Sequence, residues 1–529
     1  MLERNYLSPG RSAAIGENGM AATSHPLATL AAIDILRAGG NAMDAALAAV
    51  AVQCVIEPAM TGIGGDCFAI VAPQGKAPRS FNGSGWSPAG ISADALRASS
   101  LTSIPEDSPH AVTIPGAVDA WCQLSASYGT MDLARLLQPA IALAENGYRV
   151  TGRVALDWSR YAARVRKLPA AAAHYLPNNT PPRTGDLFRS PALAETLRAI
   201  GAKGRDAFYS GPVAEELVAT LNALGGTHQL DDFESFAGLH TQPISAKFRG
   251  HDVLECPPNG QGLAALIIAR ILDGFDLSDA AVSEADRIHI LAEASKAAYK
   301  VRDLLIADPA HMTRSVEDLL SDDFIARLRA PIRLDAALPE STWDGPIHRD
   351  TVYLTVVDRD RNCVSLINSV FASFGSGIYA PKSGVLLQNR GSGFSLRAGH
   401  PNELAPRKRP LHTIIPGMLM KDGVPVMPFG VMGGQFQAVG HGHFLTHVLD
   451  RGYDPQHANE APRSFAFGGT LTLEPGFGDA VRADLEGRGH NTAWAAEPIG
   501  GCQAIYIDNA RGVLIGGSDH RKDGMALGY

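Results

Sequence analysis

The hydrophobic positions in the first half of the chain recur at helical spacing. Apolar side chains repeat every three to four residues over several segments, which predicts helices joined by short turns. Ser24 is the predicted N-cap of the first helix, and Gly39-Gly40 ends it. A tight glycine turn at 61–66 then leads into a strand at 67–71. The predicted helices span 27–37, 41–55, 113–126, 132–145, 191–200, 212–224 and 284–301.

The pattern changes after a segment with three prolines and little periodicity, 330–349, which we interpret as an exposed linker. Residues 351–358 alternate, a polar turn follows, and 363–370 return as an aliphatic and β-branched run, which predicts a hairpin. Similar signals predict hairpins around 421–423 and 508–512, with helices at 443–449 and 479–488. The sequence thus predicts a helical half, a linker and a sheet-rich half.

Composition narrows the class of protein. The chain has 529 residues with 46 basic and 54 acidic side chains, a formal charge of -8, which argues against a nucleic-acid partner. The most apolar segment, 45–56, is about twelve residues long, short of the ~20 that span a bilayer, so no membrane partner is expected. The first twenty residues lack the apolar core of a secretory signal. We therefore expect a cytoplasmic globular protein.

Common cofactor and metal motifs were not found. The sequence has no Walker loop, zinc helix, nucleophile elbow or dinucleotide fingerprint, so no cofactor is predicted. His443 and His447 lie four apart on one helical face, but no carboxylate or cysteine nearby in the sequence completes a ligand set, and no metal site is predicted. Asp66, after the glycine turn, is a structural carboxylate or a functional one; the structural role is the simpler interpretation.

Thr351 is the residue on which the predicted chemistry depends. It follows Asp350 directly and begins the first strand of the predicted hairpin. A threonine hydroxyl is a weak nucleophile unless a base lies close to it. If Thr351 were the first residue of a chain, its own α-amino group, with a pKa near ~7.7 to 8.0, would supply that base.

Exposing this amine requires cleavage of the bond between Asp350 and Thr351. The same hydroxyl can attack the preceding carbonyl and pass through an ester, so the chain can cut itself. Taken alone, an Asp-Thr step before a strand is ordinary. The rest of the sequence decides between an ordinary strand residue and a nucleophile.

Several spaced motifs follow one another along the chain. In the first half they are residues 39–46 (GGNAMDAA), 57–58 (EP) and 62–65 (GIGG). In the second half they are 350–351 (DT), 356–358 (VVD), 374–378 (FGSGI), 401–402 (PN), 408–411 (KRPL), 433–434 (GG) and 461–463 (APR). These motifs resemble, in the same order, those of the γ-glutamyltranspeptidases, which are N-terminal-nucleophile hydrolases. The resemblance runs from about residue 12 to the end of the chain.

The resemblance implies an α+β fold, a four-layer αββα sandwich made as one precursor. Self-cleavage would give chains 1–350 and 351–529, which stay interwoven as a heterodimer; further dimerisation is left open. Thr351 would attack an amide carbonyl and form an acyl-enzyme. Ser369 stands where the family has a second hydroxyl beside the nucleophile. Gly433 and Gly434 match its oxyanion-hole glycines, whose N–H groups stabilise the tetrahedral oxyanion by about 3 to 4 kcal/mol.

The residues with which the family holds a γ-glutamyl group have changed. The family's arginine has no counterpart near Asn82, and its asparagine is replaced by Phe371. Its glutamine and aspartate positions hold Arg390 and Gly393, and its serine pair is His412-Thr413. Without the carboxylate, a buried substrate ammonium would cost several kcal/mol.

Arg390 adds a guanidinium that can hold a carboxylate in bidentate geometry. The pocket thus favours a small substrate with a carboxylate and no amino group. A structural ion pair for Arg390 and a structural hydrogen bond for His412 remain open alternatives.

Residues 412–416 (HTIIP) and 429–434 (FGVMGG) resemble a branch of the family with oxamate amidohydrolase activity, which belongs to purine and allantoin nitrogen salvage. This resemblance predicts hydrolysis of oxamate to oxalate and ammonia. Three alternatives stay open: a glutathione hydrolase or γ-glutamyl transferase, an acylase acting on a glutaryl-type amide, and an uncleaved, non-catalytic binding homologue.

Overall fold

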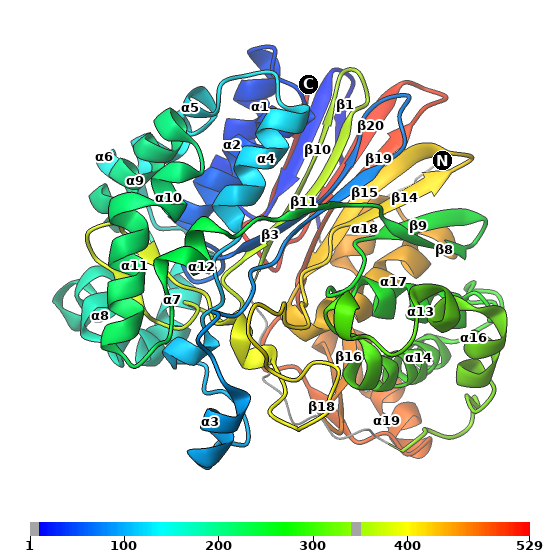
Figure 1. The fold of residues 1–529 in the computed structure, drawn as a ribbon. Coiled ribbons are helices and arrows are strands. Elements are labelled where there is room, and N and C mark those ends of the chain that lie inside the picture. The colour runs from blue at the N-terminus through cyan, green and yellow to red at the C-terminus, as the bar shows by residue number, and fades with distance from the viewer. Residues whose placement is uncertain (1–9, 340–350) are drawn as a thin grey trace.

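Two seven-stranded antiparallel sheets lie face to face in the computed structural model, which describes residues 10–339 and 351–529 (Figure 1). Sheet A has the order β1 (Ala14–Gly16), β20 (Val513–Ser518), β19 (Gly501–Asp508), β15 (Val424–Met432), β14 (Gly417–Lys421), β9 (His251–Glu255) and β8 (Ile244–Phe248). Sheet B has the order β21 (Met525–Gly528), β2 (Gly19–Thr23), β10 (Val352–Asp358), β11 (Cys363–Ser369), β3 (Asp66–Ala72), β4 (Arg79–Gly83) and β7 (Leu239–Thr241).

Helices cover the outer face of each sheet (Figure 1). On the side of sheet B lie α1 (Pro26–Arg37), α2 (Ala42–Ile56), α4 (Ala117–Tyr128), α5 (Leu133–Leu136), α6 (Gln138–Asn146), α7 (Gly152–Arg166), α8 (Pro169–Tyr175), α9 (Pro191–Lys203), α10 (Asp206–Tyr209) and α11 (Gly211–Ala223). On the side of sheet A lie α13 (Gly262–Leu272), α14 (Glu284–Leu305), α16 (Asp322–Arg329), α17 (Gln437–Leu449) and α19 (Asp479–Gly487). The αββα sandwich implied by the resemblance is confirmed.

Smaller elements complete the fold. The remaining helices are α3 (Ala93–Ala98), α12 (Leu230–Glu234), α15 (Val316–Leu320) and α18 (Pro455–Glu460). The remaining strands are β5 (Tyr148–Arg149), β6 (Leu187–Phe188), β12 (Tyr379–Ala380), β13 (Val385–Leu386), β16 (Ser464–Phe467), β17 (Thr470–Leu473) and β18 (Thr492–Trp494). Within the two described ranges, no helix has the length and apolar character needed to cross a bilayer.

Strands in the middle of sheet B are apolar on both faces because both faces are covered. Along β3, Phe68 and Ile70 point into the core between the sheets. Cys67, Ala69 and Val71 alternate with them and join the core under the helices. This double burial explains why β3 reads as a continuous hydrophobic run rather than as an alternating one.

The predicted helices are confirmed, with local differences that have physical causes. His25, not Ser24, caps α1, because its ring nitrogen accepts from the N–H of Leu27, whereas Ser24 donates to Glu57 at 2.7 Å. The helix predicted over 132–145 is divided into α5 and α6, with Pro139 in the first turn of α6. The helix predicted from residue 113 begins only at Ala117.

The division into a helical half and a sheet-rich half is too simple. The three predicted hairpins are confirmed as β10 with β11, β14 with β15, and β19 with β20. The first half, however, supplies strands to both sheets, including β8 and β9, which were not predicted. Residues 330–339 of the predicted linker form no helix or strand. Its remainder and Asp350 lie outside the described residues.

The turn before β3 approaches the end of β11 closely. A Cβ atom on Gly65 would lie 2.2 Å from the carbonyl oxygen of Ser369, so this position admits only glycine without displacement of the backbone. The Gly65 carbonyl also accepts from the N–H groups of Gly116 and Ala117, both at 3.0 Å. Gly65 thus joins three segments near the end of β11.

We predict that Gly65→Ala lowers the free energy of unfolding by about 1 to 3 kcal/mol, because the new methyl group forces backbone atoms apart. Urea denaturation measures the change. Gly487→Ala is the matched control: its Cβ would meet nothing within 4 Å, and alanine stabilises a helix by up to about 1 kcal/mol. Equal midpoints for wild type and Gly65→Ala would contradict the close approach.

Candidate functional site

Thr351 lies fully buried at the start of β10. In the pairing of β10 with β11, Val352 is opposite Asn368, so Thr351 falls beside Ser369. The Oγ1 atom of Thr351 lies 3.3 Å from the Oγ atom of Ser369. The two hydroxyls that the resemblance singled out are therefore in hydrogen-bond contact.

A third polar side chain, not predicted from the sequence, completes this group. Gln437, the first residue of α17, donates from Nε2 to Thr351 Oγ1 at 3.4 Å. Its Oε1 atom accepts from the N–H of Ile415 at 3.1 Å, which fixes the orientation of the amide. In the sequence, the only indication of this role for Gln437 is its position three residues after Gly434.

The Gly433-Gly434 pair forms the turn between β15 and α17, in left-handed backbone conformations with φ of +124° and +56°. Such angles favour glycine. Buried side chains hold the turn: Gln261 donates to the Gly434 carbonyl at 3.0 Å, and Arg302 donates to the side chain of Gln435 at 2.6 Å. A fixed turn at the start of α17, close to Gln437, suits a preorganised set of N–H donors.

Phe371 and Arg390 continue the site beyond Ser369. The N–H of Phe371 donates to Ser369 Oγ at 2.9 Å, and its backbone has a φ of +77°. The Arg390 guanidinium stacks on the Phe371 ring, 3.6 Å from the ring centroid, and donates from Nη2 to Thr413 Oγ1 at 3.0 Å. One connected group is thus formed by Thr351, Ser369, Phe371, Arg390 and Thr413.

Arg390 is 1% exposed, yet part of its guanidinium lacks a partner. In the part of the chain that the structure describes, neither Nε nor Nη1 has a hydrogen-bond acceptor, and no carboxylate lies within ion-pair distance. Burial lowers the pKa of the guanidinium, while the negative charge of Asp66 raises it. A structural ion pair for Arg390 is not seen among these residues.

Asp66 and His412 form a buried pair next to this group. His412 Nε2 lies 2.9 Å from Asp66 Oδ2, and His412 Nδ1 accepts from the N–H of Ile414 at 3.3 Å. Because Nδ1 is the acceptor, Nε2 carries the proton and donates it to Asp66. His412 therefore makes the structural hydrogen bond left open by the sequence, and its partner is a carboxylate 346 residues away.

The Asp66 carboxylate accepts several further hydrogen bonds. The N–H groups of Gly85 and Gly116 donate to Oδ1 at 3.1 and 3.2 Å, and Gln388 Nε2 lies 3.5 Å from the same atom. Burial raises the pKa of Asp66 to about 7, although the charge of Arg390 and the two N–H groups lower it. Asp66 is thus both a structural acceptor and a titratable group beside Arg390.

Asn82 is not part of this group. Its amide donates to Asn259 Oδ1 at 2.8 Å, and its oxygen accepts from the N–H of Ser84 at 2.9 Å. The side chain is therefore used to hold the loop after β4. Its predicted contact with substrate stays a prediction.

The four-layer sandwich is the fold of the N-terminal-nucleophile hydrolases. The chain belongs to the γ-glutamyltranspeptidase family: the family model described as Gamma-glutamyltranspeptidase matches residues 28–529.

Two relatives and one solved structure cover nearly the whole chain. A glutathione hydrolase-like proenzyme of Bacillus subtilis, YwrD, is 36% identical over 524 residues, 97% of this chain and 99% of that protein. An oxamate amidohydrolase proenzyme of Klebsiella pneumoniae is 34% identical over 534 residues, 98% of this chain and 100% of that protein. The crystal structure of cephalosporin acylase from Bacillus halodurans is similar with a TM-score of 0.93 at 38% identity, covering 100% of this chain and 99% of that one.

The histidines of α17 have a carboxylate neighbour that the sequence did not reveal. Glu255, at the end of β9, contacts His441 Nδ1 at 2.5 Å. The rings of His443 and His447 lie tilted against each other with centroids 4.3 Å apart, and burial lowers the pKa of His447 to about 3. His447 Nδ1 also contacts the His443 carbonyl at 2.8 Å, as expected of packed helix residues.

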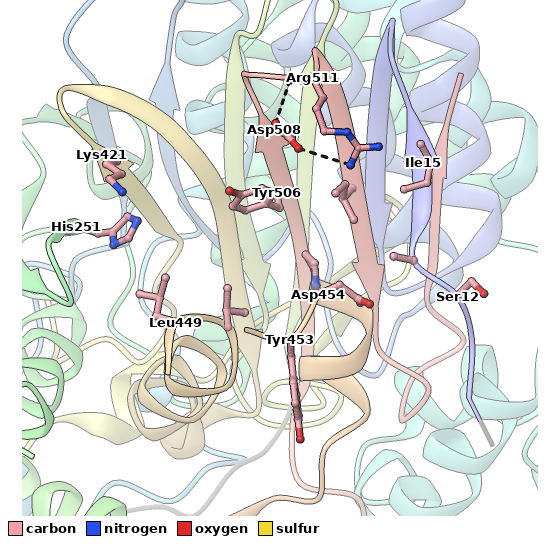
Figure 2. Close-up of a pocket in the computed structure, with 14 residues that line it drawn as sticks. Ser12, Ile15, His251, Lys421, Leu449, Tyr453, Asp454, Tyr506, Asp508 and Arg511 are labelled. Carbon is pink, nitrogen blue, oxygen red and sulfur yellow. Dashed lines mark hydrogen bonds and ion pairs between the residues drawn. The ribbon is translucent and has the colours of Figure 1, made fainter. Parts of the chain in front are cut away.

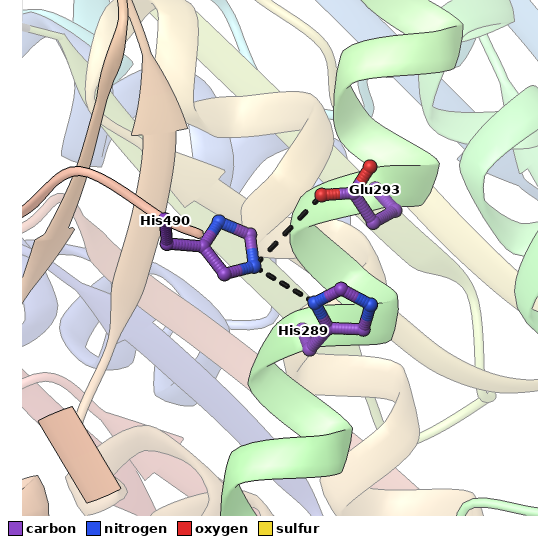
Figure 3. Close-up of side chains that lie close together, drawn as sticks. All are labelled: His289, Glu293 and His490. Carbon is purple, nitrogen blue, oxygen red and sulfur yellow. Dashed lines mark hydrogen bonds and ion pairs between the residues drawn. The ribbon is translucent and has the colours of Figure 1, made fainter. Parts of the chain in front are cut away.

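A separate buried cluster has the residue types of a metal site (Figure 3). Potential ligand atoms of His289, Glu293 and His490 all lie within 4.8 Å of one another. However, the Lys296 ammonium donates to Glu293 Oε1 at 2.9 Å, so the chain itself supplies a cation to this carboxylate. We therefore interpret the cluster as a structural network.

This network holds the segment 333–338, which follows α16. His289 Nε2 bonds to the Arg333 carbonyl at 2.6 Å. The N–H of Leu338 donates to Glu293 Oε2 at 3.0 Å, and Lys296 donates to the Leu338 carbonyl at 3.1 Å. Together, His289, Glu293 and Lys296 fix residues 333–338 against α14.

A cavity of about 680 Å³ lies elsewhere, on the outer face of sheet A (Figure 2). Tyr506 of β19 and Leu449 of α17 line it, and His251, Lys421 and Arg511 lie along its rim. None of its lining residues belongs to the group around Thr351. The cavity is thus distinct from the candidate active site.

We predict that His289→Ala frees residues 333–338 and speeds tryptic cleavage after Arg333 roughly tenfold. The loss of one or two buried hydrogen bonds, about 1 to 1.5 kcal/mol, favours local opening. The new fragment, identified by a sequence beginning at Leu334, measures the rate. His251→Ala, on the cavity rim, is the control and leaves the rate as in wild type. An unchanged rate in His289→Ala would show that other contacts hold the segment.

Proposed function

We propose that this protein is a self-processing amidohydrolase that hydrolyses a small amide bearing a carboxylate, with oxamate as the preferred substrate. The observation that carries the proposal is the connected, buried group in which the Thr351 hydroxyl leads through Ser369 and Phe371 to the guanidinium of Arg390. The group combines a nucleophile at one end with a carboxylate-binding cation at the other.

Processing comes first in this proposal. The Thr351 hydroxyl attacks the Asp350 carbonyl carbon, the peptide becomes an ester, and water hydrolyses it. The products are chains 1–350 and 351–529, which remain together as a heterodimer. The naming of both relatives as proenzymes supports this step.

In the mature enzyme the freed α-amino group takes the proton of the Thr351 hydroxyl, and the oxygen attacks the amide carbonyl of oxamate. Ser369 and Gln437 orient the hydroxyl, and the N–H groups of the Gly433-Gly434 turn face the developing oxyanion. The C–N bond breaks, and the amino group returns the proton to ammonia. Water then resolves the acyl ester and releases oxalate.

The charges of the pocket favour oxamate over a γ-glutamyl group. A γ-glutamyl substrate brings an ammonium that needs an acceptor, but the nearby Asp66 carboxylate already accepts from Gly85, Gly116 and His412. Oxamate has a carboxylate and no ammonium, and two donor atoms of Arg390 have no acceptor among the described residues. The oxamate amidohydrolase relative supports the same substrate.

A glutaryl-type acylase is the second candidate. It is favoured by the likeness to the cephalosporin acylase structure. A glutaryl group also ends in a carboxylate that Arg390 could hold, but its longer chain needs more room beside Phe371. Turnover of oxamate, a glutaryl amide and a γ-glutamyl anilide, compared on processed enzyme, separates these functions.

We predict that Thr351→Ala abolishes both processing and amide hydrolysis, because it removes the attacking oxygen. On a denaturing gel, wild type gives bands of about 350 and 179 residues and the variant one band of 529. Edman degradation of the small wild-type chain begins at Thr351. Thr351→Ser, which keeps a hydroxyl, is the matched control and is processed. Residual amidase activity in Thr351→Ala would refute this nucleophile.

We predict that Arg390→Met lowers kcat/KM for oxamate on the order of 10²-fold or more, because a buried carboxylate loses its cation. Hydrolysis of oxamide, which has the same shape without the charge, changes by about threefold or less. Arg390→Lys keeps the charge but not the bidentate geometry, and an intermediate loss is expected. Ammonia release measures all three. Equal losses for oxamate and oxamide would mean that Arg390 supports the fold rather than the carboxylate.

A further inference from the structure

The buried group around Thr351 and Arg390 lies next to one more titratable group than the proposed reaction uses. Asp66 is 1% exposed and lies at the start of β3, where it receives the Nε2 proton of His412. The next residue, Thr413, accepts a hydrogen bond from Arg390. Two consecutive residues thus join the Asp66 carboxylate to the guanidinium that the proposed function assigns to the substrate.

The net charge of this buried region changes when an anionic substrate binds. Without substrate, the buried Arg390 cation is balanced by the Asp66 anion. A bound substrate carboxylate adds a second negative charge to the same water-poor region. An excess buried charge is strongly unfavourable unless it is compensated.

The other charged and titratable groups around Asp66 do not supply the compensation. Arg409 is close enough to act on Asp66, but Asp308 acts on it more strongly, and its guanidinium is held by the carbonyls of Ser84 and Ala237. Cys67 is a buried thiol whose pKa is raised well above its usual value by burial, so it stays neutral. The Asp66 and His412 pair is the group that can change its charge near neutral pH.

We propose that substrate binding is coupled to the uptake of one proton by the Asp66 and His412 pair. This inference rests on the proposed function, in which Arg390 holds the substrate carboxylate. The incoming anion pairs with Arg390, a proton from solvent neutralises the Asp66 and His412 pair, and the pocket keeps its net charge. Asp66 and His412 are positioning residues that set the pH range in which an anionic substrate binds.

The sign of the effect follows from linkage. A ligand whose binding takes up a proton binds more weakly as the pH rises. Because burial places the pKa of Asp66 at about 7, the pair is already protonated at lower pH and KM is flat there. Above about pH 7, KM for oxamate rises by up to tenfold per pH unit.

The test compares the pH dependence of KM for oxamate with that for oxamide between pH 5.5 and 9, on processed wild-type enzyme. The ratio of the two KM values removes titrations that both substrates share, including that of the Thr351 amine. Oxamide serves as a competitive inhibitor where it turns over slowly. We expect the ratio to be flat at low pH and to rise above about pH 7.

Two variants separate proton coupling from a structural role. In Asp66→Asn, which cannot lose a proton, the rise of the ratio disappears. Glu255→Gln is the matched control, because Glu255 also forms a buried carboxylate pair with a histidine, His441, but belongs to sheet A. In that variant the rise is retained. Calorimetric binding of oxalate to wild type at pH 8, in two buffers of different ionisation enthalpy, counts the protons directly; about one is expected.

The outcomes distinguish this inference from the proposed function. Preference for oxamate that depends on Arg390, together with a flat KM ratio and no proton uptake, overturns the coupling and leaves the proposed function standing. Oxamate that is neither bound nor hydrolysed overturns both. A rise that persists in Asp66→Asn also overturns the coupling, because the titrating group then lies elsewhere.

Discussion

The pairing register of β10 with β11 is the constraint on which the site depends. Val352 opposite Asn368 places the Thr351 hydroxyl next to Ser369, and both strands are buried on both faces. A slip of one residue would send every side chain of β10 to the opposite face. Asn368 fixes the pairing further, since its amide donates to Thr61 at 2.8 Å and to the Gly62 carbonyl at 3.2 Å. The glycine turn before β3 and the β10–β11 pair are thus fitted to each other.

Buried charge is the second constraint, and it explains why the residues around Arg390 form a set. An arginine at position 390 alone would place a guanidinium in an apolar interior at high cost. Here Asp66 supplies the opposite charge, and Thr413 and the Phe371 ring supply a hydrogen bond and a cation–π contact. Asp66 in turn is held by backbone N–H groups and by His412. Each of these groups therefore lowers the cost of burying the others.

Most of the fold was predictable because helical periodicity survives where a helix covers a sheet. The long helix α14 and the three hairpins were placed within a few residues. Strands β8 and β9 were missed because they are short and half-exposed at the edge of sheet A. The break before α6 was missed because the apolar pattern continues across it. In the structure, Pro139 outweighs that pattern and lies in the first turn of a new helix.

The candidate site was predictable only in part. Thr351 and Ser369 followed from resemblance, and the departures from the family pattern pointed to Arg390. Gln437 and the bond between Asp66 and His412 could not be found, because no local pattern records a contact between residues 86 or 346 positions apart.

The interleaving of the two predicted chains bears on how cleavage could create a base without disturbing the site. Strand β10 lies between β2 and β11, and β11 lies beside β3, so strands from before and after the proposed cleavage position are interleaved within sheet B. In sheet A, β1 pairs with β20 and β9 with β14 in the same manner. Strand β10, which follows Thr351 directly, is therefore held on both sides by hydrogen bonds to β2 and β11. Breaking the proposed bond between residues 350 and 351 changes the α-nitrogen from an amide to an amine and removes none of these hydrogen bonds.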